Sequence, residues 1–157
     1  MGVIFPEIKR VKDNVLESAH DKLRMPEAKL QDLIRHGFRK IGASPIPFRA
    51  KDSPNEIADI EFFRVRIGKR LTSFAVVVKG FNSIPGKRLS WEDISHQVTK
   101  AQMLGKPDHV MVISAKEPKD TVVTYLTMYG QAVENPNLVV FVPPRELLRF
   151  ILSSEHS

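Results

Sequence analysis

The chain has 157 residues, of which 42% are apolar and 27% charged, values typical of a globular domain rather than a disordered or fibrous chain. It contains no cysteine, which excludes disulfides, thiolate zinc sites and cysteine nucleophiles. No apolar run approaches the roughly 20 residues of a membrane span, and the N-terminus lacks the pattern of a signal peptide. We therefore expect one cytoplasmic domain over residues 1–157, with no membrane partner.

The formal net charge of +6 is distributed unevenly along the chain. Residues 1–51 carry a net charge of +5, residues 52–106 carry +3, and residues 107–157 carry −2. This asymmetry predicts one positive face and favours a polyanionic partner. Solvated lysines also keep proteins soluble without binding anything, so charge alone leaves both interpretations open.

Two helices are predicted in the first part of the chain. Pro6 is suited to start a helix that runs to about Asp21, and Pro26 to start a second. Gly42 is the predicted stop of the second helix. Four apolar residues fall on one stripe of that helix and should face the core: Leu30, Leu33, Ile34 and Phe38.

A β-hairpin is predicted next. Residues 43–56 contain three prolines and read as extended or loop. Residues 57–65 alternate as a strand does, residues 68–70 form a turn, and residues 71–79 form the return strand. The run of three valines at 76–78 indicates that this second strand is buried on both faces.

A loop over residues 80–89 is followed by a helix with a recognisable start. Ser90 can cap the helix while Asp93, at the third helical position, reaches back to the cap. The predicted inward side chains of this helix are Ile94, Val98, Ala101 and Leu104.

The second half of the chain alternates strand and helix. We expect strands over 109–115 and 138–142, a helix over 120–134, and a last helix that opens at Pro143-Pro144. The predicted inward residues of these two helices are Val123, Leu126 and Tyr129, then Leu147, Leu148 and Ile151. Strand–helix alternation requires crossovers and parallel pairing, whereas the hairpin is antiparallel. The fold class is therefore α/β, with a mixed sheet and helices on both sides.

Two polar residues stand out against this order of elements. Asp59 lies in the first strand of the hairpin, within EIADIEFF, and Lys79 ends the second strand, within VVVKG. This pattern resembles the PD-(D/E)XK, or restriction-endonuclease-like, superfamily, and is nearest to Mrr-type endonucleases and archaeal Holliday-junction resolvases. The resemblance covers about residues 26–150. It implies a core over 26–152 with a four- to five-stranded mixed sheet, and an N-terminal helical extension over 1–25.

The resemblance assigns roles to individual residues. Asp59 stands at the family's first strand acid, and Lys79 at the lysine of its motif. Glu27 stands where many members have a helix glutamate close to the metal, and Gln97 where Mrr-like proteins keep a helix glutamine. Val77 occupies the position of the second motif acid. Each of the four polar residues also has an ordinary interpretation as a solvated or capping side chain.

The family's chemistry is phosphodiester hydrolysis with Mg²⁺ or Mn²⁺. Magnesium prefers oxygen ligands and lowers the pKa of its bound water, while the lysine orients that water or neutralises phosphate charge. Val77 cannot bind a cation. Glu61 is two residues after Asp59 and should point the same way, so it is a candidate second ligand and catalytic residue. Glu27, Glu56 and Glu92 are further candidates.

Nucleic-acid contacts are expected around this site. Lys87 and Arg88, in the loop after the lysine, are candidate phosphate contacts, as are Arg39 and Lys40. Trp91, the only tryptophan, either stacks on a base or packs against the sheet.

Three functions follow as alternatives. The first is a DNA-binding, Mg²⁺-dependent endonuclease. The second is a nuclease-fold protein without catalysis that serves as a DNA-binding or assembly subunit. Val77, at the position of the second motif acid, favours this alternative. The third is a protein-interaction module. A homodimer is expected by resemblance, since relatives that act on duplexes often dimerise.

Overall fold

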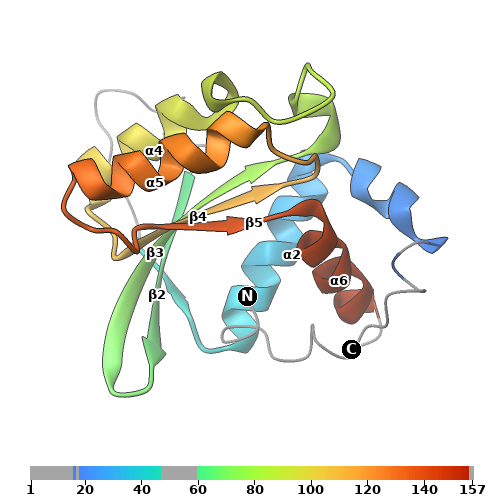
Figure 1. Cartoon of the computed structure of the whole chain (residues 1–157). Helices are drawn as coiled ribbons and strands as arrows, with labels where there is room; N and C mark the ends of the chain where they lie inside the picture. The colour runs from blue at the N-terminus through green and yellow to red at the C-terminus, as the bar shows by residue number, and fades with distance from the viewer. Residues whose placement is uncertain (1–15, 17, 47–59, 156–157) are drawn as a thin grey trace.

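The computed structural model describes residue 16 and residues 18–46 and 60–155 (Figure 1). The helix predicted over residues 6–21 therefore lies almost entirely outside the described residues. Its last positions lead into a 3-10 helix, η2 (His20–Arg24). No helix of the described part of the chain is long and apolar enough to cross a membrane.

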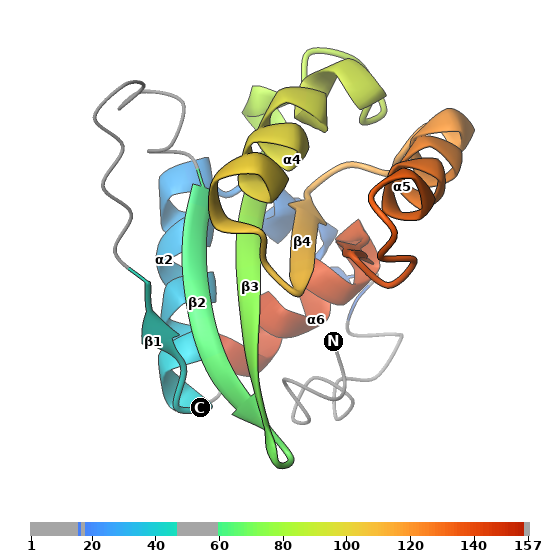
Figure 2. The same ribbon diagram turned by 90° about the vertical axis from the view of Figure 1, so that its left-hand side faces the viewer.

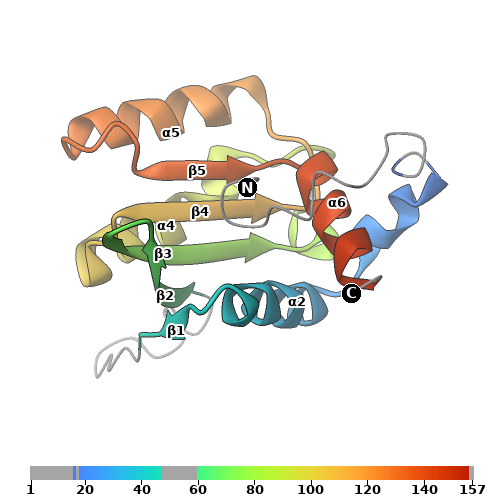
Figure 3. The ribbon, with the colours of Figure 1, turned by 90° about the horizontal axis from the view of Figure 1, so that it is seen from below.

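A five-stranded mixed sheet forms the centre of the molecule (Figure 3). The strands lie side by side in chain order, with β1 and β2 antiparallel, β2 and β3 antiparallel, and β3, β4 and β5 parallel. Their bounds are β1 (Ser44–Pro45), β2 (Ile60–Ile67), β3 (Arg70–Lys79), β4 (His109–Ser114) and β5 (Val139–Val142). The predicted fold class, hairpin and mixed sheet are confirmed.

In the described part of the chain, four helices cover the two faces of this sheet (Figure 1). Helices α2 and α6 lie on one face, and α4 and α5 on the other. Their bounds are α2 (Glu27–Lys40), α4 (Trp91–Gly105), α5 (Asp120–Ala132) and α6 (Pro144–Glu155). The layers follow from the sequence, because the parallel pairs β3–β4 and β4–β5 are each connected through a helix.

The alternation of β3 divides the core into two clusters. Val76 and Val78 pack against α2 and α6, whereas Ala75 and Val77 pack against α4 and α5. All four side chains are at most 6% exposed. This explains the continuous valine run, since a central strand covered on both faces needs apolar residues at every position.

The register of the hairpin is fixed by its turn. Ile60 lies opposite Val77, and Ile67 lies opposite Arg70, so only Gly68 and Lys69 separate the strands. Gly68 has φ +62°, a conformation that glycine adopts without steric cost. Two-residue connections of this kind determine which side chains share a face along the whole hairpin.

One predicted core residue of α4 is wrong. Leu104 is 40% exposed, although Ile94, Val98 and Ala101 are buried as expected. The buried stripe advances by four, three and four residues and so ends on Gly105, where an added Cβ would lie 2.4 Å from the Phe62 ring. Leu104 is about 100° away from this stripe and faces solvent.

The inward face of α5 is also rotated from the prediction. Val123 is 52% exposed, whereas Val122 is fully buried and Leu126 is 4% exposed. The observed stripe consists of Val122, Leu126 and Tyr129, which are four and three residues apart. This spacing matches the helical period of 3.6 residues better than the two three-residue steps of the predicted stripe.

Candidate functional site

The carboxyl ends of the three parallel strands form one edge of the sheet. Lys79 ends β3, directly beside Ser114 at the end of β4. The amide of Ala115 donates to the carbonyl oxygen of Lys79 at 3.0 Å, which extends this pairing by one residue. In open α/β sheets this edge is the usual place for a ligand.

Helix α4 holds Gln97 beside Lys79. The capping box that was expected at its start is present: Ser90 accepts from the amide of Asp93, and the Asp93 carboxylate accepts from the amide of Ser90 at 2.8 Å. With the Gln97 amide oriented so that its oxygen faces the ammonium, Oε1 accepts from Lys79 Nζ at 2.9 Å and Nε2 donates to the Asp93 carbonyl oxygen at 3.3 Å. An ammonium can only donate, which selects this orientation.

Glu27 reaches the same edge from the start of α2. Its Oε1 accepts from the amide of Gly80, the residue after Lys79, at 2.9 Å. The approach is close enough to require glycine, because a Cβ at position 80 would lie 2.8 Å from the Glu27 Cβ. The second carboxylate oxygen, Oε2, accepts no hydrogen bond from the described residues.

Val77, for which the resemblance predicts the position of the second motif acid, lies in apolar surroundings. Val77 is 1% exposed and packs among core residues of α4, including Ile94 and Val98. Ile60, its partner across the hairpin, is 4% exposed and belongs to the same cluster. A carboxylate at this depth would lose its hydration, and the described side chains around Val77 are apolar and cannot bind a metal.

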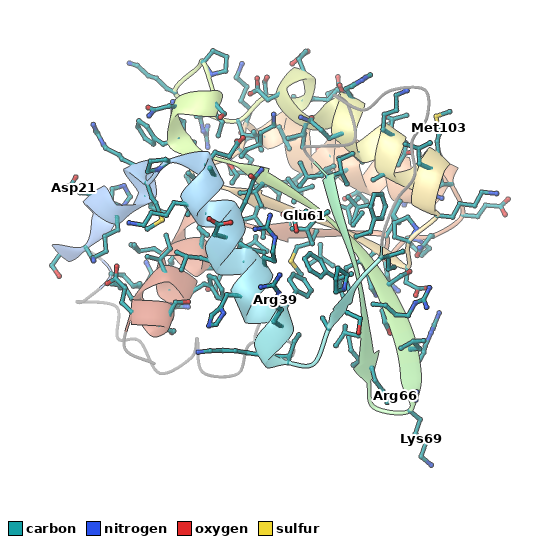
Figure 4. The ribbon with its side chains drawn as sticks, turned by 180° about the vertical axis from the view of Figure 1, so that it is seen from behind. Asp21, Arg39, Glu61, Arg66, Lys69 and Met103 are labelled. Atoms are coloured by element: carbon teal, nitrogen blue, oxygen red, sulfur yellow. The ribbon has the colours of Figure 1, made fainter. Side chains whose placement is uncertain are left out.

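Glu61 faces the opposite side of the sheet. Its two oxygens accept from Arg35 of α2, Oε1 from Nη2 at 2.6 Å and Oε2 from Nε at 3.0 Å (Figure 4). Arg35 also donates to Asp32 at 2.6 Å. The hydrogen bonds that Arg35 donates to Glu61, reinforced by the negative charge of Glu61, raise the pKa of Arg35. The structure therefore does not bring Glu61 together with Lys79.

The described residues alone do not fit a magnesium ion. Asp59 and Glu56 lie outside the described residues. Within the described ranges no three acidic or histidine side chains gather in a group that could hold a metal. Glu27 supplies one carboxylate at the edge, and Glu92 is exposed at the start of α4.

A rigid loop borders the edge, and sequence reasoning missed the residue that holds it. Lys116, just after β4, donates from Nζ to the carbonyl oxygens of Ile84 at 2.8 Å and Gly86 at 2.7 Å. The same ammonium lies 4.4 Å from the centre of the Phe81 ring, and Arg24 stacks on that ring at 4.9 Å. No motif or spacing in the sequence singles out this contact, because residue 116 is about 30 positions from its partners.

This loop carries two of the residues that were predicted to contact nucleic acid. Lys87 and Arg88 are both exposed on it. Trp91 is partly buried, 5.8 Å from the ring of Tyr125, an arrangement that matches the packing interpretation. Arg39 and Lys40 end α2, about 18 Å along the helix from Glu27, so they belong to the other end of the molecule.

Comparisons with known proteins extend the description of the fold. No protein-family model matches the sequence, and no curated protein matches it. Among solved structures, the chain is similar to the DNA modification-dependent restriction endonuclease AspBHI, with a TM-score of 0.49 and 13% identity over 99% of this chain and 35% of that one. It is also similar to the MspJI restriction endonuclease in complex with a 27-mer oligonucleotide, with a TM-score of 0.47 and 14% identity over 91% of this chain and 32% of that one. The chain thus spans about a third of the length of these proteins.

Proposed function

We propose that this chain is a nuclease-fold protein that binds DNA through the carboxyl edge of its sheet. The observation that carries the proposal is the pairing of Lys79 with Gln97 at the end of β3, beside a basic loop held in place by Lys116. A fixed ammonium and two exposed cations next to one another are the side chains that phosphate groups select.

The geometry suits a phosphate contact at Lys79. An ammonium has three N–H donors, and Gln97 takes one of them, which leaves donors for a phosphate oxygen. Lys87 and Arg88 add charge without an acidic neighbour in the loop. Contacts of this kind give affinity and register but no sequence preference.

A test is fluorescence anisotropy with a labelled DNA duplex over a salt series. We expect Lys79→Met, and the double change Lys87→Gln with Arg88→Gln, to weaken binding and to lower the slope of log K against log salt by about one per removed phosphate contact. Arg39→Gln is the matched control, since Arg39 is exposed at the end of α2, on the opposite face of the sheet. Absence of duplex binding at about 50 mM salt would refute the proposal.

The second candidate is a Mg²⁺- or Mn²⁺-dependent endonuclease. It is favoured by Glu27, whose Oε2 accepts no hydrogen bond from the described residues. Asp59 would have to provide the remaining carboxylate, and the buried Val77 counts against a complete site. Incubation of plasmid and junction DNA with Mg²⁺ or Mn²⁺ tests it: cleavage that Asp59→Ala and Lys79→Ala both abolish would establish this candidate.

A further inference from the structure

The hairpin of β2 and β3 carries a second concentration of positive charge. The hairpin projects beyond the helices at the end of the sheet opposite to Lys79 (Figures 2 and 4). Its outer part contains four cations within seven residues, namely Arg64, Arg66, Lys69 and Arg70. From residue 62 to residue 91 the chain has seven lysines and arginines and no acidic residue.

The two arginines of β2 project from a part of the sheet face that no described helix covers. Val65 and Ile67 turn toward the core under α2, so Arg64 and Arg66 point the other way and are exposed. Helix α4 covers that face only as far as Phe62, because the helix ends at Gly105 against the Phe62 ring. The residues across the strand pair, Ser73 and the 50% exposed Leu71, leave the arginines accessible.

Little in the described structure neutralises these cations. Arg70 forms a long ion pair with Asp108 at 3.2 Å and is itself 77% exposed. Arg66 donates to the carbonyl oxygen of Lys69 at 3.4 Å and to no acidic side chain of the described ranges. No acidic side chain among the described residues pairs with Arg64, Arg66 or Lys69, and Figure 4 shows Lys69 extending outward from the turn.

The base of the hairpin is anchored, so the charges have a fixed direction. Asp108 accepts from the amide of Ser73 at 2.9 Å and from its hydroxyl at 3.2 Å. These hydrogen bonds, the backbone one first, lower the pKa of Asp108. The arm therefore rises from a rigid junction between β3 and the turn that precedes β4.

One strand joins the two basic regions. β3 runs from Arg70 to Lys79, about 30 Å at the rise of an extended strand. The alternation of the hairpin puts Lys79 and the arginine pair on the same face of the sheet. Arg64 and Arg66 lie opposite Ser73 and Leu71. These positions are about 20 and 26 Å from Lys79 along the strand, which is within the 34–36 Å of one duplex turn.

We propose that the β2–β3 hairpin is a second phosphate-binding arm, which contacts a DNA duplex within one helical turn of the Lys79 edge. The inference rests on the proposed function and extends the DNA-contacting surface from the Lys79 edge to the hairpin. Arginine suits this role because its planar guanidinium forms two parallel hydrogen bonds to a phosphate. Regular spacing of phosphates favours a duplex over an acidic protein, whose carboxylates have no such repeat.

The test uses the full chain and duplexes of two lengths. The variant is the double change Arg64→Gln with Arg66→Gln, and a second variant is Lys69→Gln. Leu71→Gln is the matched control, because it alters the same face of the hairpin without removing charge. On a duplex of about two turns, we expect the double variant to lower the log–log salt slope by about two and Lys69→Gln by about one. On a duplex of about half a turn, parent and variants should bind equally.

Each outcome decides between the two proposals. Unchanged affinity and slope in the hairpin variants, with binding still weakened by Lys79→Met, would overturn the arm and leave the proposed function standing. A parent chain that binds no duplex would overturn both. Polyglutamate of equal charge that competes as well as duplex, in a manner dependent on Arg64 and Arg66, would assign the arm to an acidic protein instead. Circular dichroism confirms that each variant is folded.

Discussion

At the scale of single residues, Gly80 determines how closely α2 approaches the end of β3. Its φ of −72° suits any residue outside proline, so the requirement is for space rather than for backbone freedom. A methyl group there would lie 2.8 Å from the Glu27 Cβ and 3.0 Å from its Cα. Backbone atoms cannot move aside as the end of a flexible side chain can, and the hydrogen bond from Gly80 to Glu27 depends on the same approach.

We predict that Gly80→Ala destabilises the fold by about 1–3 kcal/mol, the usual cost of overpacking. Urea unfolding followed by circular dichroism measures this change. Gly86→Ala is the control, because its nearest contact would be the Arg88 carbonyl oxygen at 3.4 Å and the position is exposed. Equal effects of the two substitutions would contradict the steric explanation.

The structure brings some of the predicted site residues together and separates others. Lys79, Gln97 and Glu27 were expected near one another, and the structure brings Gln97 onto Lys79 and Glu27 onto the following residue. Glu61 was expected on the side of Lys79 but pairs with Arg35 on the opposite face. Alternation with a period of two shows which residues of one strand point to the same face of the sheet. Which residues of the neighbouring strand share that face depends on the register between the strands. A register shift of one residue moves every side chain of a strand to the other face. Asp59 stays a prediction.

At the scale of elements, the segment after β4 fastens the loop of residues 81–89 to the sheet. The amide of Leu89 donates to the carbonyl oxygen of Glu117 at 2.8 Å, and the amide of Lys119 donates to that of Leu89 at 2.9 Å. Lys116 adds two hydrogen bonds and a contact with the Phe81 ring. Several hydrogen bonds therefore attach the loop to the segment after β4 at this edge of the sheet.

We predict that Lys116→Met loosens this loop and weakens DNA binding through Lys87 and Arg88. Hydrogen exchange should accelerate in residues 81–89 while the exchange of β3 stays unchanged. The binding loss should not add to that of the Lys87→Gln, Arg88→Gln double change, because both act through the same contacts. Lys119→Met is the control, since that side chain is exposed on the same segment. Fully additive losses would show that Lys116 contacts the DNA itself.

Element boundaries were predicted well where local chemistry determines them. Pro26 and the Ser90–Asp93 pair fix where α2 and α4 begin, and a reading of neighbouring residues is sufficient to find them. The inward faces of α4 and α5 were predicted less well: Leu104 and Val123 were expected to be buried but are exposed. The facing of a helix is set by the sheet on which it packs, which no local window contains.

At the scale of the whole molecule, the sheet separates two apolar cores, and the charges gather at its two ends. The basic edge around Lys79 and the basic hairpin are joined by β3, whose middle is buried on both faces. The acid-free stretch from residue 62 to residue 91 is the sequence signal of this arrangement. This stretch is found only when positive and negative residues are counted separately along the chain. The net charge hides the stretch, because it includes the acidic residues on either side.

The last prediction concerns the response of the folded protein to magnesium. A ligand that binds only the native state at ten times its Kd adds about 1.4 kcal/mol to the free energy of unfolding, which corresponds to a rise in Tm of about 3–6 °C for a domain of this size. We expect no rise beyond that given by a monovalent salt of equal ionic strength. Among the described residues, Glu27 is the one carboxylate hydrogen-bonded to the carboxyl end of β3, and the buried Val77 of that strand offers no oxygen ligand. Differential scanning calorimetry with Mg²⁺, and with EDTA as the reference, measures the shift. A rise that Asp59→Asn and Glu27→Gln each remove would instead mean that these two acids share a cation, and would favour the endonuclease over the DNA-binding subunit.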